Sequence, residues 1–97
     1  MSKSYEARVK IEQIGETEEI GTNGFKKREV IGVVEGEYPD HYKFEFIKDK
    51  TSLPDELIEG AYATISFNLK GKKVESKKEA GEFNYFTALQ AWKISTD

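Results

Sequence analysis

The chain has 97 residues, a formal net charge of -3 and no cysteine. This length fits a single domain over residues 1–97 with one core, and the lack of cysteine excludes a disulfide framework, thiolate zinc ligands and a thiol nucleophile. The acidic total argues against non-specific attraction to a polyanion, so a nucleic-acid site would need a local concentration of positive charge.

The first predicted element is a strand over residues 4–14, "SYEARVKIEQI", in which apolar and charged residues alternate. That period of two is typical of a half-buried strand. The glycine-rich, acidic segment 15–24 predicts a connecting loop or an irregular strand end. The N-terminus lacks the continuous apolar stretch of a secretory signal, and no run approaches the length of a membrane span. We therefore expect a cytoplasmic protein without a membrane partner.

Residues 25–49 predict two strands joined by a turn at 35–40, "EGEYPD", where proline suits the turn. The one helix signal follows in "TSLPDELIEG", residues 51–60. Ser52 is the predicted N-cap of that helix, and Gly60 its predicted stop.

Residues 61–71 alternate again, residues 72–82 form a predicted lysine-rich loop, and "NYFTALQAWKI" at 84–94 is the last predicted strand. The order is three strands, a short helix and two strands. It predicts an all-β protein with the OB-fold, a five-stranded Greek-key barrel that has one short helix between strands 3 and 4. An open sheet with one helix stays an alternative at this point.

Catalytic residue patterns are missing from the sequence. The single histidine, His41, stands in a predicted turn beside Asp40, without a recognisable partner motif. The acidic residues have no calcium-loop spacing, and no glycine-rich phosphate loop precedes a helix. We interpret His41 as an exposed turn residue and predict a protein that is not an enzyme and that needs no metal or cofactor.

Positive charge is concentrated in two segments. "FKKR" at 25–28 carries three basic residues, and "KGKKVESKK" at 70–78 carries five lysines against one glutamate, a local charge of +4. An OB-fold brings such segments together, because it binds oligonucleotides or oligosaccharides on the face of strands 2 and 3 and on the loops beside it. Lysines that only confer solubility are the simpler explanation, but the predicted fold favours a groove. Phe25, directly before the basic triplet, is a candidate for stacking on a base.

The last predicted strand carries aromatic rings on both faces. We favour Leu89 and Ala91 as its core side, which would place Trp92 beside the groove or at its margin. Tyr85 and Phe86, next to the lysine-rich loop, are better placed to stack on bases. The predicted nucleic-acid-binding residues are Phe25, Lys26, Lys27, Arg28, Lys70, Lys72, Lys73, Lys77, Lys78, Tyr85, Phe86 and Trp92.

Three stretches, "FKKREVIGVVEGEYPDHYKFEF", "LIEGAYATISFNLKG" and "YFTALQAWKI", resemble a family of short bacterial and phage proteins catalogued as a domain of unknown function. That family is similar to single-stranded DNA-binding OB-folds, and the resemblance runs from about residue 5 to residue 95. It implies single-stranded DNA binding in replication, recombination or repair of a phage or its host. It also maps the family's basic-aromatic opening of strand 2 onto 25–28 and its aromatic pair onto Tyr85 and Phe86.

Three hypotheses follow. The leading one is a sequence-tolerant single-stranded DNA-binding protein, whose partners are the DNA, further copies of the chain and replication or recombination proteins. The second is an OB-fold protein-interaction or assembly module, which the acidic total and "ETEEI" at 16–20 would fit. The third is binding of RNA or an oligosaccharide by the same face, which the sequence does not separate from the first.

Overall fold

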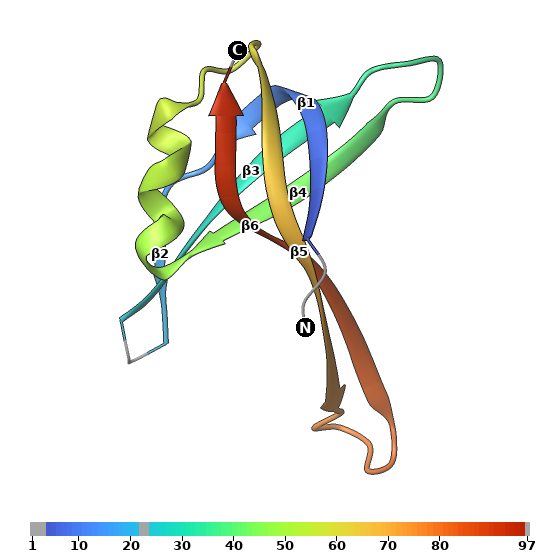
Figure 1. Ribbon diagram of the computed structural model, residues 1–97. Coiled ribbons are helices and arrows are strands. Elements are labelled where there is room, and N and C mark those ends of the chain that lie inside the picture. The colour runs from blue at the N-terminus through green and yellow to red at the C-terminus, as the bar shows by residue number, and fades with distance from the viewer. Residues whose placement is uncertain (1–3, 22–23, 97) are drawn as a thin grey trace.

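The computed structural model describes residues 4–21 and 24–96. It has six strands and one 3₁₀ helix (Figure 1): β1 (Ser4–Ile14), β2 (Glu18–Ile20), β3 (Phe25–Val34), β4 (Asp40–Ile47), η1 (Lys48–Glu56), β5 (Tyr62–Glu75) and β6 (Phe83–Thr96). The five long strands pair in the order β1–β5–β6–β4–β3, and β3 pairs back onto β1, so the sheet closes on itself. Among the strand pairings of the described residues, only β4–β6 is parallel. This is the connectivity of the predicted OB-fold, with β2 as a short addition.

The core lies inside the closed sheet, where the alternating apolar side chains of the long strands meet. Its buried members are Val9, Ile11, Val30, Phe44, Phe46, Leu57, Ala63, Ile65 and Ala91, and Leu89 packs against them. The predicted core side of the last strand is therefore confirmed. Gly32 allows β1 to lie close across β3, because a Cβ at that position would be 2.6 Å from Cγ2 of Val9.

The helix bounds predicted from the sequence are wrong. Ser52, the predicted N-cap, lies inside η1, and Gly60, the predicted stop, lies beyond its end. The helix begins earlier, at Lys48, whose φ of 54° turns the chain out of β4. Tertiary packing rather than capping sets its position, since Thr51 and Pro54 are buried against one end of the barrel.

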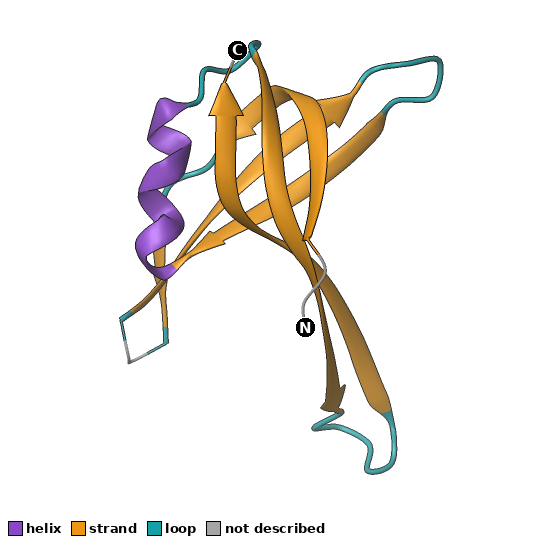
Figure 2. Ribbon diagram, viewed as in Figure 1, coloured by secondary structure: helices purple, strands orange, loops and turns teal. Residues whose placement is uncertain are grey.

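The predicted loop at 72–82 is wrong at its start, because β5 continues to Glu75, whereas its predicted end agrees with the start of β6 at Phe83. β1 pairs with β5 only as far as Asn68. Beyond that residue β5 and β6 continue as a two-stranded ribbon, which we call the β5–β6 hairpin (residues 69–89). Figures 1 and 2 show this hairpin projecting from the barrel. Within the described residues, no helix is long and apolar enough to cross a membrane.

Candidate nucleic-acid interface

The basic triplet at the start of β3 does not form one surface, because neighbouring residues of a strand point to opposite faces. Lys27 lies on the outer face, with its Nζ 3.4 Å from Glu45 and 3.7 Å from Glu29. Lys43 adds a third contact, since its Nζ is 3.5 Å from the Glu29 carboxylate. These two lysines and two glutamates balance one another across β3 and β4.

Arg28 points to the opposite face and joins parts of the fold. Its Nε donates to the carbonyl oxygen of Gly15 at 2.8 Å, and its guanidinium also donates to the carbonyl oxygen of Thr51 and to Asp55, at 3.1 and 2.7 Å. Its side chain is 15% exposed. The predicted phosphate contact is therefore not supported by its position. Alternation with the buried Val30 was the signal in the sequence for this inward direction.

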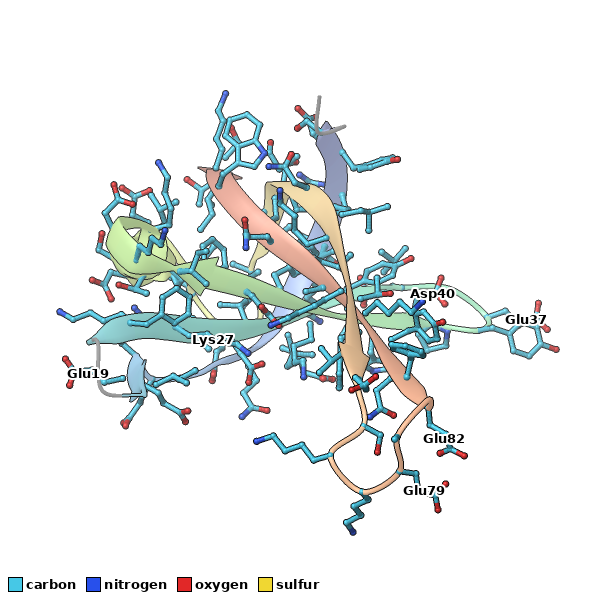
Figure 3. The ribbon with its side chains drawn as sticks, turned by 90° about the horizontal axis from the view of Figure 1, so that it is seen from below. Glu19, Lys27, Glu37, Asp40, Glu79 and Glu82 are labelled. Carbon is cyan, nitrogen blue, oxygen red and sulfur yellow. The ribbon has the colours of Figure 1, made fainter. Side chains whose placement is uncertain are left out.

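β2 brings further acidic residues to this part of the molecule. It pairs Glu19 with Lys26 and Glu18 with Lys27, and cross-strand pairs of opposite charge stabilise a sheet. Figure 3 shows Lys27 on β3 and Glu19 on β2. Phe25 is half-buried at the start of β3. The predicted groove on this face is consequently not a positive one.

A hollow of about 440 Å³ lies beside these residues, between β2, β3 and the end of β1. Three glutamates, Glu16, Glu18 and Glu29, line it together with one lysine, Lys27. This hollow is acidic and does not favour a polyanion.

The five lysines predicted for the second basic segment do gather, on the β5–β6 hairpin. The hairpin also carries three glutamates, and Figure 3 shows Glu79 and Glu82 at its tip. Its net charge is therefore +2, less than the +4 of the sequence segment. Two of its rings are well exposed, with 72% of Tyr85 and 57% of Phe86 accessible to solvent.

The strand register places each of these rings opposite a lysine. Phe86 pairs with Lys72, and Tyr85 pairs with Lys73, whose Nζ also lies 4.1 Å from the centre of the Phe83 ring. Tyr85, Lys73 and Phe83 therefore share one face of the hairpin, while Phe86 and Lys72 share the other. The two faces each carry a cation beside an aromatic ring, an arrangement that suits a nucleic-acid single strand.

Trp92 does not lie with the hairpin rings. Opposite Ser66 the register shifts, so that β6 carries an extra residue between Ala91 and the half-buried Ile94. Trp92 is 41% exposed at this irregularity. It is six residues, about 20 Å of strand, from Phe86. Strict alternation could not assign its face, because a bulge reverses the parity of the residues beyond it.

The end of the barrel opposite η1 is open, which the sequence did not reveal. A hollow of about 500 Å³, which we call the barrel mouth, is found there. Its lining includes Tyr5, Val34, Tyr42, Phe67, Leu69 and Leu89. The rings of Tyr5 and Phe67 are stacked, with centroids 5.8 Å apart and planes at 23°. Tyr5 stands at the outer end of the apolar face of β1, so its ring is 39% exposed.

His41 is the second residue of β4 and is exposed, with its Nε2 3.6 Å from the Glu12 carboxylate. In the part of the chain that the structure describes, no three histidine, cysteine, aspartate or glutamate side chains are grouped so as to hold a metal ion.

Comparisons with known proteins agree with this architecture. The family described as "Domain of unknown function (DUF3127)" matches residues 6–95. No curated protein matches the chain. Among solved structures, the mitochondrial single-stranded DNA binding protein Rim1 of S. cerevisiae is similar, with a TM-score of 0.69 and 11% identity over 99% of this chain and 95% of that one. The SSB domain of a Synechococcus sp. protein is also similar, with a TM-score of 0.70 and 12% identity over 98% of this chain and 94% of that one. At such identities the likeness shows the fold alone.

Proposed function

The chain belongs to the DUF3127 family, and we propose that this member is a sequence-tolerant single-stranded DNA-binding protein that acts by binding and not by catalysis. The observation that carries the proposal is the β5–β6 hairpin, where lysines and exposed rings stand opposite one another on a ribbon that projects from the barrel. The fold supports it too, because one similar structure is a mitochondrial single-stranded DNA binding protein and another is an SSB domain.

Both parts of this surface suit a single strand of any sequence. Lysine side chains attract phosphates and release the counterions bound to them, which makes the affinity dependent on salt. Each base that stacks on an exposed ring contributes about 1–3 kcal/mol, and every base has a flat face. A role in DNA replication, recombination or repair belongs to the proposal, since exposed single strands arise in those processes.

A second candidate function is a protein-interaction module. The observation that favours it is the outer face of β3 and β4, where positive and negative side chains are balanced and the neighbouring hollow is acidic. Such a face suits a protein partner better than a nucleic acid. It lies apart from the hairpin, so one molecule can hold both kinds of site.

The proposal is tested by titrating the protein into fluorescently labelled oligo-dT at low and at high salt. Matched duplex DNA and single-stranded RNA serve as competitors. We expect tight binding that weakens as the salt concentration rises. We also expect unlabelled oligo-dT to displace the labelled strand better than duplex DNA does. Absence of binding even at low salt would refute the proposal and leave the protein-interaction module. If single-stranded RNA competes equally well, the ligand in the proposal becomes single-stranded nucleic acid in general and not single-stranded DNA.

A further inference from the structure

Gly71 stands inside β5, on the β5–β6 hairpin, at a position where nothing in the structure calls for glycine. Its φ is not in the left-handed region, and a Cβ added there would meet only the carbonyl oxygen of Phe86, at an ordinary 3.9 Å. Gly32 differs, since its Cβ would collide with Val9. A glycine inside a strand weakens it and often marks a bulge, a bend or the close approach of a ligand, and the pairing of β5 with β6 has no register shift at Gly71.

The strand register shows which face Gly71 leaves open. Gly71 pairs with Thr87, and on the same face the flanking pairs are Lys73 with Tyr85 on one side and Leu69 with Leu89 on the other. Successive pairs on one face are about 7 Å apart along the strands. The Gly71–Thr87 pair, which we call the Gly71–Thr87 step, is therefore a shallow depression in this face. The Lys73–Tyr85 pair lies on one side of it and the Leu69–Leu89 pair on the other.

The same step opens onto the barrel mouth, because Leu69 and Leu89 line that hollow. Beyond them lie the stacked rings of Tyr5 and Phe67. The volume of about 500 Å³ is within the range of small-molecule sites, about 300–1,000 Å³. The hollow is mostly apolar and ring-lined, with Glu6 and Arg8 also in its lining, and a hollow of this kind beside a cationic ribbon suits a group with flat faces and an attached negative charge.

We propose that a nucleobase of the bound strand sits over the Gly71–Thr87 step, stacked on Tyr85, with its phosphate near Lys73. The strand then runs along this face of the hairpin towards the barrel mouth, and not along the face that carries Phe86. This inference rests on the proposed function and specifies the path of the ligand. Lys73 favours a nucleotide over an apolar side chain of a protein partner, since this cation pairs with Tyr85 across the strands, lies over the Phe83 ring and complements a phosphate.

The first test compares the variants Gly71→Ala and Gly71→Val with Ala88→Val, which adds similar bulk on the opposite face of the hairpin. A Cβ fits at this position, and β-branched residues favour strands, so we expect a melting temperature equal to or above that of the unaltered protein. We expect Gly71→Val to weaken oligo-dT binding about tenfold, as the loss of one stacked base would, with Gly71→Ala between it and the unaltered protein. The salt dependence should not change, because no charge is altered. Ala88→Val should bind normally.

Unchanged affinity in both Gly71 variants would overturn the path while leaving the proposed function intact, provided that the unaltered protein binds and that loss of the hairpin lysines weakens binding. If the unaltered protein does not bind, the proposed function fails first.

A second measurement does not depend on a variant that folds. Oligo-dT that contains 5-iodouracil is bound, irradiated and mapped by mass spectrometry, since the photoactivated base reacts with the ring on which it stacks. Cross-linking at Tyr85 is the expected result. Cross-linking at Phe86 without Tyr85 would overturn the inference and place the strand on the opposite face.

Discussion

Replacing three hairpin lysines by glutamine is the most direct test of the binding surface. The variant Lys72→Gln, Lys73→Gln, Lys77→Gln removes three of the five cations that the β5–β6 hairpin presents. For single strands, the slope of log K against log salt is about -0.7 for each phosphate neutralised, so it reaches about -3.5 if the long side chains of all five lysines, from both faces of the hairpin, engage phosphates. Affinity should then fall about 100-fold between 50 and 200 mM salt, against about sevenfold in the variant, whose expected slope is about -1.4.

The assay is fluorescence anisotropy of labelled oligo-dT over this salt range. A matched control, Lys26→Gln, Lys43→Gln, Lys50→Gln, removes three exposed lysines outside the hairpin and so changes the net charge equally. We expect the control to keep most of the slope. Equal slopes for the unaltered protein and the hairpin variant would refute the reasoning. A larger loss of slope in the control than in the hairpin variant would indicate that DNA binds on the β3–β4 face.

Three further outcomes follow from the structure. Arg28→Ala should lower the free energy of unfolding by about 2–3 kcal/mol, because a partly buried cation with several acceptors is lost. Asp55→Ala removes only an exposed partner of that cation and should lower it by less than about 1 kcal/mol. Thermal unfolding followed by circular dichroism measures both losses, and equal losses would contradict the role given to Arg28. The Tyr62 hydroxyl donates a hydrogen bond to the Glu35 carboxylate, which raises the tyrosine's pKa above 10.0. The bond therefore favours the folded state at pH values below 10.0 and is lost as the pH rises through the raised pKa. Glu35→Gln should move the ultraviolet titration of one tyrosine to lower pH, and coincident titration curves of the variant and the unaltered protein would contradict this. Trp92 emission should stay constant when oligo-dT binds the hairpin, since the ring is about 20 Å of strand from Phe86, and strong quenching would mean that DNA reaches the register shift in β6.

The strand order could be predicted because its signals are local. Each long strand alternates apolar and polar residues, and turn residues separate the strands, so the OB-fold order follows from the sequence. The face of Trp92 could not be predicted in the same way. The register shift opposite Ser66 depends on the pairing of two strands, and alternation along one strand contains no sign of it.

The site residues were harder to place, for two physical reasons. Lys27 and Arg28 are adjacent in sequence, which predicts a shared groove, but the pleat separates them and Arg28 has partners in the fold. The sequence predicts part of the hairpin as a loop because a ribbon outside the barrel has no core beneath it. Residues 72–75 therefore show no apolar alternation, even though their backbone is paired as a strand.

The projection of the hairpin resolves the conflict between an acidic protein and an anionic ligand. With +2 on residues 69–89, the chain total of -3 leaves -5 for all other residues. Seven residues of β5, from 69 to 75, extend about 23 Å, whereas charges are screened over about 8 Å at physiological ionic strength. The outer lysines are thus electrostatically separated from the acidic barrel, and a polyanion meets the positive ribbon before it meets the negative body. Shortening the hairpin while keeping its lysines would bring them within the field of those acids, so the length of the ribbon is itself a determinant of the binding that we propose.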